Sequence, residues 1–547
     1  MRWRKPVRPE LGAFAVASFT ATIVNVPFWR QLHTAVAPRD AYEVLFIGAV
    51  LVVALSLLTL FFQLLMGRWT FKPLATALLL VSSAAAYFIS EYGIVIDAGM
   101  LTNVLESDPA EMADLLTPKL LAYVVGLGVL PSLLLWTLTI AYRPFWQELR
   151  VKGLALVVAV VLVSLAALPF VQMTSVFRQH RMLLDAFMPL NYLSAVGEYG
   201  RKRLRRAPSA PTEVAGDAHR SAAWGARHRK SVTVIVLGET ARAKNFSLNG
   251  YERTTNPLLA TVLGLINFPR AYSCGTDTAQ SLPCMFSGMG HAEFSIERAR
   301  RQEGLLDVLQ RVGFDVLWRE NQGGCKGVCN GVRTELMEGA GTRTLFELGG
   351  ARDEKLLEGL AERIAALKGH GVIVLHMMGS HGPAYYKRYP AAFERFKPAC
   401  KESQFSRCTT SQIVNSYDNT IVYTDYVLFR LIELLRARDV EDVPTAMVYL
   451  SDHGESLGED NIYLHGLPYA FAPDVQKHIP MVMWLSPKFQ ADFGVDTACV
   501  RRHSRETVSH DNLFHSVLGL LDVATRLYDA KLDVFAGCRS PRAEGAD

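Results

Sequence analysis

Five long apolar runs in the first 177 residues restrict what this chain can fold into more than any other feature of the sequence. They cover residues 11–29, 44–67, 73–90, 120–142 and 153–177. A helix needs about 20 apolar residues to cross a bilayer, and each run reaches or approaches that length. A cleavable signal peptide is the alternative for the first run, which follows basic residues, but four further runs come after it. The sequence therefore predicts a transmembrane domain of five spans at residues 1–177.

The charges between the runs predict the side of the membrane on which each loop lies, because Lys and Arg near a span stay in the cytoplasm. Basic residues precede the first run and lie between the second and third runs and between the fourth and fifth. The loop after the third run is acidic, with Asp97, Glu106, Asp108, Glu111 and Asp114. Five spans that begin in the cytoplasm end outside it. We therefore expect the chain after residue 177 to be extracytoplasmic.

All eight cysteines lie at or after Cys274, in the half that this topology places outside the cytoplasm. Disulfides persist in oxidising compartments, so the even number and close spacing predict bridges between cysteines that are neighbours in sequence. The predicted pairs are Cys274 with Cys284, Cys325 with Cys329, Cys400 with Cys408, and Cys499 with Cys538. A metal cluster or free buried thiols are the alternatives.

Residues 178–230 are predicted to be a bridging segment between the two halves. Apolar and polar residues mix up to residue 200, which is typical of amphipathic pieces lying in the membrane interface. A basic cluster follows, which fits either anionic headgroups or a solvated linker: Arg201, Lys202, Arg203, Arg205 and Arg206. Pro208, Pro211 and the small residues around them then predict flexible chain. The net charge of +5 is small for 547 residues, and it gives no support to nucleic-acid binding.

Residues 231–547 have the pattern of an α/β domain, with short β-branched runs between helical stretches. Three predicted strands, at 232–237, 371–375 and 446–450, each end in polar residues that are able to bind a metal. Ligands in open α/β sheets gather beyond the carboxyl ends of the strands, so these three ends are expected to converge. A single strand-end Asp or His is usually a cap or a turn residue, but three such ends favour a site.

The candidate metal ligands are Glu239, His381, Asp452, His453 and His465. Carboxylate and imidazole groups together suit Zn²⁺ first and Mn²⁺ second. A nucleophile is expected in the loop between Cys274 and Cys284, where a metal would hold an alkoxide at neutral pH. Thr276, Thr278 and Ser281 are the candidate hydroxyls, and spacing alone does not choose among them. A disulfide-pinned surface turn is the alternative for this loop.

Several of these motifs, taken together, resemble the bacterial phosphoethanolamine transferases, in particular the lipid A enzymes and the mobile colistin resistance enzymes. The motifs are residues 238–243 (GETARA), 249–253 (NGYER), the loop at 274–284, 379–383 (GSHGP), 415–423 (NSYDNTIVY) and 451–456 (SDHGES). The resemblance covers nearly the whole chain. It implies an N-terminal five-helix membrane domain and a periplasmic α/β domain with the alkaline phosphatase and sulfatase fold.

The resemblance also assigns roles by motif position. It implies that Thr278 is the nucleophile and that Glu239, Thr278, Asp452 and His453 hold the first zinc. It places His381 and His465 near the donor phosphate or a second metal, and Lys326 and His376 at polar positions of the substrate pocket. Gln322 and Gly323 stand where some relatives carry small polar residues that contact substrate, so the resemblance assigns them no contact.

The implied activity is transfer of phosphoethanolamine from phosphatidylethanolamine to lipid A in the Gram-negative inner membrane, by a monomer that binds no nucleic acid. Such transfer weakens the binding of polymyxins and other cationic peptides. The alternatives are transfer to an inner-core sugar or another periplasmic acceptor, phosphoglycerol transfer, and a non-catalytic membrane sensor or binding module. The sequence does not favour a sulfatase, because no Cys or Ser stands in the Cys/Ser-x-Pro-x-Arg motif that formylglycine formation requires.

Overall fold

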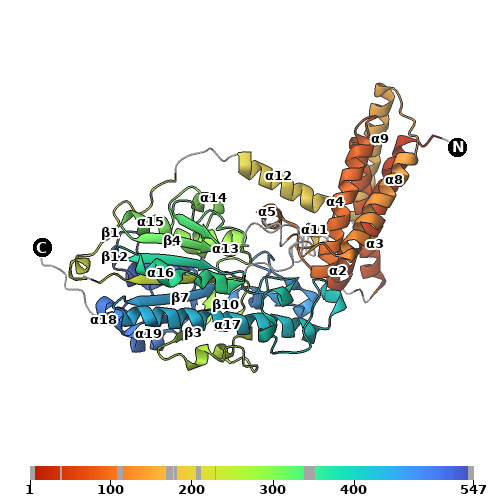
Figure 1. Ribbon diagram of the computed structural model, residues 1–547. Helices are drawn as coiled ribbons and strands as arrows, with labels where there is room; N and C mark the ends of the chain where they lie inside the picture. Colours follow the sequence, from red (N-terminus) through yellow and green to blue (C-terminus); the bar gives the residue numbers. More distant parts are fainter. Residues whose placement is uncertain are drawn as a thin grey trace. The chain divides into compact units, whose positions relative to one another are not determined.

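A computed structural model describes residues 6–36, 38, 40–106, 112, 115–167, 177, 182–204, 211–227, 229–337 and 352–539 (Figure 1). The chain divides into two compact units. Residues 1–101 and 116–203 form the smaller unit, and residues 102–115 and 204–547 form the larger. The domain boundaries after residues 177 and 230 remain predictions.

Four helical stretches of the smaller unit are long and apolar enough to cross a membrane. They are α3 (Ala41–Leu64), α4 (Phe71–Tyr92), the stretch Pro118–Thr137, and α9 (Phe145–Ala167). The stretch Pro118–Thr137 consists of α7 (Pro118–Tyr123), a π-helix (Val124–Val129) and α8 (Leu130–Thr137). Figure 1 shows α3, α4, α8 and α9 side by side in one bundle. The described residues thus contain four spans, or five if a bent N-terminal pair of helices is one span.

This N-terminal pair differs from the straight span predicted at residues 11–29. The helix from Pro9 to Val24, which includes α1 (Pro9–Phe19), meets α2 (Val26–Val36) at an angle of 56°. Asn25, at the bend, is fully buried, and its side chain donates to Thr20 O at 2.9 Å and to Met188 O at 2.8 Å. Its Oδ1 accepts from Met188 N at 2.8 Å. The bend satisfies a polar side chain that an apolar environment otherwise penalises.

The last span also begins earlier than predicted, at Phe145 rather than at residue 153. The extra turns carry Glu148, Arg150 and Lys152, which our prediction placed in a loop. Long basic side chains at a helix end extend their charges toward water or toward backbone acceptors, and Lys152 Nζ donates to Met66 O at 3.1 Å. Charged residues near the end of a span therefore do not mark where the helix begins.

The bridging segment is ordered in two pieces within the described residues. α11 (Met182–Asp185) and α12 (Leu190–Leu204) follow the spans, and Leu183, Phe187 and Met188 are buried in the smaller unit. Part of the basic cluster, Arg201 to Arg203, lies on α12, whereas Arg205, Arg206 and Pro208 lie outside the described residues.

Residues 211–227, which belong to the predicted bridging segment, are folded as part of the larger unit. β1 (His219–Arg220) pairs with β12 (Val523–Ala524). Trp224 is buried and its Nε1 donates to Leu521 O at 2.9 Å, while Arg227 forms an ion pair with Asp522. Small and charged residues thus fold here because one tryptophan supplies a large apolar surface.

The larger unit is built on an eight-stranded sheet in the order β11-β3-β10-β7-β2-β6-β4-β5. The strands are β2 (Val232–Gly238), β3 (Ile266–Tyr272), β4 (Asp315–Glu320), β5 (Arg333–Leu336), β6 (Gly371–His376), β7 (Thr445–Ser451), β10 (His478–Leu485) and β11 (Val508–Ser509). Among the described strands of this sheet, only β10 is antiparallel to its neighbours. The predicted largely parallel sheet is confirmed.

The three predicted strands are direct neighbours at the centre of the sheet. Val232 on β2 lies opposite Gly371 on β6 and Thr445 on β7. Because the pairing is parallel and in register, the carboxyl ends of β7, β2 and β6 meet at the same edge. This confirms the expected convergence.

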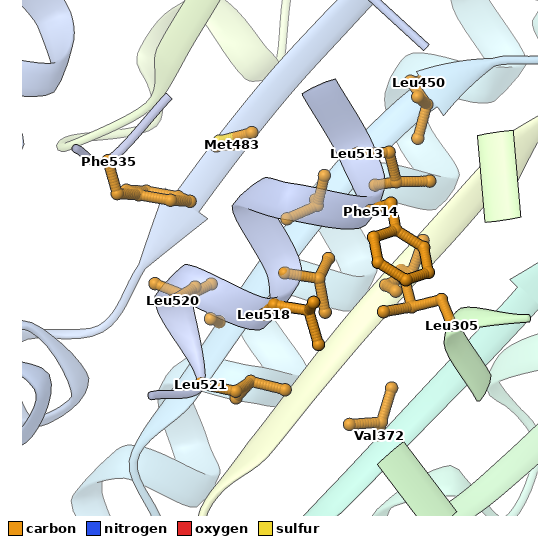
Figure 2. Packing of buried hydrophobic residues seen from close by; sticks show 14 of the residues in the cluster. Leu305, Val372, Leu450, Met483, Leu513, Phe514, Leu518, Leu520, Leu521 and Phe535 are labelled. Atoms are coloured by element: carbon orange, nitrogen blue, oxygen red, sulfur yellow. The ribbon is translucent and has the colours of Figure 1, made fainter. Parts of the chain in front are cut away.

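Both faces of the sheet are covered, as buried parallel strands require. Alternate residues such as Ile235, Val372 and Leu450 belong to one core together with helices α13 (Thr278–Ser287), α15 (Leu305–Arg311) and α20 (Asp511–Leu520). Figure 2 shows Phe514 and Leu518 of α20 among the strand residues. The intervening strand residues, including Val234 and Met447, are also buried, and α17 (Thr410–Val440) packs against β7 on the larger unit.

The eight cysteines form four disulfides, in the pairs that the sequence predicts. The Cys274–Cys284 bridge joins the loop before α13 to the middle of that helix, so it fixes where α13 begins.

Replacement of Phe514 by Ala tests the core of the larger unit. Phe514 is 1% exposed, so Phe514→Ala is expected to lower the free energy of unfolding by about 3–5 kcal/mol. Leu263 is 85% exposed, and Leu263→Ala should change it by less than about 0.5 kcal/mol. Chemical denaturation of the detergent-solubilised chain measures both. Equal effects of the two substitutions would contradict the packing shown in Figure 2.

Candidate metal and nucleophile site

A cluster of fully buried polar side chains lies where β2 and β7 end. Glu239 follows β2, and Asp452 and His453 follow β7. All three have no exposed surface, and one potential ligand atom of each lies within 4.8 Å of the others. His453 Nε2 is 3.4 Å from Glu239 Oε1 and 3.3 Å from Asp452 Oδ2. The structure thus brings together three of the five metal ligands that we predict from the residues alone.

Thr278 completes this cluster from a different element. It is the first residue of α13, whose N-terminus is capped by Asp277 through a hydrogen bond from Gln280 N. Thr278 Oγ1 donates to Glu239 Oε2 at 3.0 Å and lies 3.4 Å from His453 Nε2. The helix start therefore fixes a hydroxyl beside the ligand cluster.

The other two candidate hydroxyls of the loop have different surroundings. Thr276 Oγ1 donates to Leu467 O at 2.6 Å. Ser281 is fully buried, and its hydroxyl has no hydrogen-bond partner among the described residues. Geometry therefore favours Thr278, the residue that the family resemblance assigns.

The ring of His453 is oriented to present Nε2 as an acceptor. Its Nδ1 donates to Gly454 O at 2.9 Å, which leaves the lone pair on Nε2 facing Glu239 and Asp452. Asp452 Oδ1 accepts from Thr240 N at 3.1 Å, whereas its Oδ2 is buried without a hydrogen-bond partner among the described residues. An unpartnered buried carboxylate oxygen beside an imidazole lone pair and a hydroxyl fits a bound divalent cation with three oxygen ligands and one nitrogen ligand.

The backbone around Glu239 is held in an unusual conformation. Thr240 has a φ of 53°, which costs about 1–3 kcal/mol for a residue with a side chain. Its N–H bonds Asp452 and its carbonyl accepts from Tyr417 Oη at 2.6 Å. Gly379, after β6, has a φ of 53°, and a Cβ there would lie 2.6 Å from Glu239 O. Glycine is therefore required where this loop approaches Glu239.

The charges of the cluster shift its acid–base behaviour. Burial raises the pKa of Asp452, but His453 and the hydroxyl of Thr278 outweigh burial, so this pKa lies below its usual value. Burial, together with His465 and Arg388, lowers the pKa of His381 to about 3. A carboxylate and a neutral imidazole are the protonation states that bind metals.

His381 and His465, the remaining two predicted ligands, lie beside the cluster. The rings of His453 and His465 are 4.4 Å apart, and those of His465 and His381 are 5.6 Å apart. His465 Nδ1 donates to Glu455 Oε2 at 2.8 Å. Glu455 is fully buried, and sequence reasoning missed it although it stands in the same motif as His453.

Two predicted pocket residues differ in their surroundings. Lys326 has a φ of 51° in the loop closed by the Cys325–Cys329 disulfide, and it lines a hollow of about 980 Å³ together with Pro283 and Phe286 of α13. His376, the last residue of β6, has no exposed surface.

One ring nitrogen of His376 is bonded inside the larger unit, and the other, Nε2, is buried without a hydrogen-bond partner among the described residues. Its Nδ1 donates to Glu320 Oε1 at 2.9 Å. Burial lowers the pKa of His376, but the carboxylate of Glu320 outweighs burial and raises it. The placement of His376 in the substrate pocket stays a prediction, because the residue has no exposed surface but neither have Glu239, Asp452 and His453.

Gln322 belongs to the site, although our sequence analysis assigns it no contact. It is 4% exposed, and its Nε2 donates to Glu239 Oε2 at 2.8 Å. It follows β4, which is parallel to β6 and ends at the same edge. The sequence signal that could have identified Gln322 is its position as a polar residue after the end of a fourth strand, β4.

Comparison with known proteins gives matches over both halves of the chain. The family described as Sulfatase matches residues 231–523, and the family described as Phosphoethanolamine transferase EptA/EptB matches residues 54–204. Phosphoethanolamine transferase EptA of Escherichia coli K12 is 42% identical over 97% of this chain and 98% of that protein. Phosphatidylethanolamine transferase Mcr-1 of Escherichia coli is 36% identical over 95% of this chain and 96% of that protein.

A solved structure agrees over the same length. The integral membrane protein lipooligosaccharide phosphoethanolamine transferase A (EptA) from Neisseria meningitidis has a TM-score of 0.92 and 34% identity. The match covers 97% of this chain and 99% of that chain. The predicted fold class and location are confirmed: this is an integral inner-membrane protein with a sulfatase-like α/β domain in the periplasm.

Replacement of His453 tests the ligand cluster. His453→Gln is expected to weaken Zn²⁺ binding by more than about 100-fold, because loss of an outer partner of a ligand alone costs 10–100-fold. His515→Gln is the matched control, since His515 is 4% exposed and its Nδ1 accepts from Asp529 N at 3.0 Å, with no described contact to the cluster. Titration of metal-free protein with Zn²⁺ measures both. Equal affinities of the two variants would rule out this cluster as the metal site.

Proposed function

We propose a reaction for this chain, which belongs to the bacterial phosphoethanolamine transferase family: transfer of phosphoethanolamine from phosphatidylethanolamine to a phosphate of lipid A. Thr278 carries the group as a covalent intermediate, and Zn²⁺ is the cofactor. The observation that carries this proposal is the position of Thr278 Oγ1, which lies 3.0 Å from Glu239 Oε2. Glu239 belongs to a cluster of three potential metal ligands with no exposed surface, and no other such cluster is found among the described residues of the larger unit.

In the first step Thr278 Oγ attacks the phosphorus of the donor. A new bond forms between Oγ and phosphorus, and the bond from phosphorus to the glycerol oxygen breaks. The hydroxyl proton leaves through the carboxylate of Glu239, which already accepts the Thr278 hydrogen bond. Diacylglycerol departs with one proton on its new hydroxyl. When bound, Zn²⁺ lowers the pKa of the Thr278 hydroxyl and offsets charge on the phosphoryl oxygens.

The residues around Thr278 have separate roles in this proposal. Glu239, Asp452 and His453, with Thr278 itself, hold the metal. Gln322 fixes one oxygen of Glu239 by its hydrogen bond of 2.8 Å. His381 and His465 lie beside His453 and would bind the donor phosphate or a second metal. Lys326 supplies positive charge in the hollow that it lines together with Pro283 and Phe286 of α13.

In the second step a phosphate oxygen of lipid A attacks the same phosphorus. The bond from phosphorus to Thr278 Oγ breaks, and Oγ takes up a proton, which regenerates the hydroxyl. The product carries an ammonium group where the acceptor carried only negative charge. Cationic peptides such as polymyxins then bind the modified surface less strongly, because part of the opposite charge is neutralised.

The membrane spans serve this reaction by anchoring the enzyme in the bilayer that holds its substrates. Donor and acceptor are both lipids, so an enzyme anchored in the same bilayer meets them at a high effective concentration. This holds for a single chain, and we propose that the enzyme acts as a monomer.

Mass spectrometry of lipid A tests the proposal directly. The host is a Gram-negative strain that lacks its own transferase, and it expresses the wild-type chain, Thr278→Ala or Thr278→Ser at equal levels. We expect a phosphoethanolamine increment with the wild type, less with Thr278→Ser, which keeps a hydroxyl, and none with Thr278→Ala.

The other outcomes separate the alternatives. Unmodified lipid A, with the wild-type protein in the membrane and loaded with zinc, would exclude lipid A as the acceptor. An increment on core sugars would identify a different acceptor, and a phosphoglycerol increment a different donor. Transfer by Thr278→Ala would exclude the proposed nucleophile.

A further inference from the structure

We propose that His510 is a positioning residue that holds the loop of the nucleophile against the strand end that carries two metal ligands. This inference rests on the proposed function, because it takes Thr278 as the nucleophile. His510 lies 45 residues from His465 and farther in sequence from every other residue of the site, and it stands outside all the motifs that we singled out.

The backbone of His510 is fixed by the edge of the sheet. It follows β11, whose residues Val508 and Ser509 lie opposite Ala271 and Tyr272 on β3. His510 N donates to Tyr272 O at 2.9 Å. Because β3 leads directly into the loop of Cys274, this pairing places His510 beside that loop.

The imidazole bridges the loop and the end of β7. His510 Nδ1 accepts from Cys274 N at 3.0 Å, and its Nε2 donates to Ser451 O at 2.9 Å. A backbone N–H on one side and a carbonyl on the other require a neutral ring with its proton on Nε2. One tautomer therefore satisfies both groups.

Both peptide groups that His510 binds, those of Cys274 and Ser451, lie close to the proposed nucleophile and metal ligands. Ser451 immediately precedes Asp452, and Cys274 begins the disulfide-closed segment in which α13 starts with Thr278. The ring thus sets the distance between the nucleophile and two of its metal ligands. It has no exposed surface, so it touches no substrate.

The expected consequence is a loss of rate rather than of substrate binding. A displacement of about 1 Å at a reacting group reduces the rate about 100-fold, and the loss of a partner behind a metal ligand costs about 10–100-fold. We expect kcat to fall by about 10- to 100-fold when the bridge is broken, with KM nearly unchanged.

Two substitutions each keep one half of the bridge. The Oδ1 of His510→Asn occupies the place of Nδ1 and keeps the bond to Cys274, whereas the Nε2 of His510→Gln occupies the place of Nε2 and keeps the bond to Ser451. His510→Ala keeps neither. His515→Asn and His515→Gln are matched controls, because His515 is buried on the adjoining helix α20 and its Nδ1 likewise accepts a backbone N–H.

The experiment uses the full chain in mixed micelles of detergent, phosphatidylethanolamine and lipid A as the acceptor, and it measures kcat, KM for phosphatidylethanolamine and the melting temperature of each variant. We expect His510→Asn and His510→Gln to lose about 10- to 100-fold in kcat while their melting temperatures match those of the His515 variants. The first half-reaction, formation of the adduct on Thr278, should slow to the same extent.

Three results would overturn the inference. One is a kcat within about threefold of wild type for His510→Asn or His510→Gln. The second is a rate loss that the His515 variants share at equal loss of melting temperature. The third is failure of all His510 variants to fold while the His515 variants fold, which would assign His510 to folding alone. Absence of any adduct in the wild type would instead contradict the proposed function.

Discussion

The burial of two carboxylates beside each other is the constraint on which the rest of this structure depends. Glu239 and Asp452 have no exposed surface, and like charges in a low-dielectric interior are tolerated only when a cation or hydrogen bonds compensate them. His453, Thr278 and Gln322 supply part of that compensation. Asp452 Oδ2 has no hydrogen-bond partner among the described residues, and a divalent ion held by this cluster would satisfy it.

The register of the sheet decides where the charged residues of this cluster lie. β2 pairs in parallel with β6 and β7, so one edge receives the ends of three strands. A shift of one residue in β7 would turn Asp452 to the opposite face. Local features then fix the loops at this edge of the sheet. They are the positive φ of Thr240, the close approach of Gly379, the helix cap by Asp277 and the hydrogen bonds of His510.

Much of this arrangement is predictable from the sequence, but unevenly. β-branched runs that end in Glu239, His376 and Asp452 indicate the strands and their shared edge, because both periodicity and strand-end chemistry are local signals. The bend at Asn25 and the packing of Trp224 are not predictable in this way, since each depends on a partner far away in the chain. For the same reason Gln322, Glu455 and His510 escape motif reasoning: only pairing across the sheet or a contact between loops brings them to the site.

The central claim is that Thr278 carries the transferred group, and peptide mass spectrometry of the protein tests it most directly. The purified, zinc-loaded chain is incubated with phosphatidylethanolamine in the absence of an acceptor and is then digested. The account predicts a phosphoethanolamine increment on the peptide that contains Thr278, with fragments that place it on this residue. An increment on another residue, or continued transfer with no adduct at any time point, would contradict it.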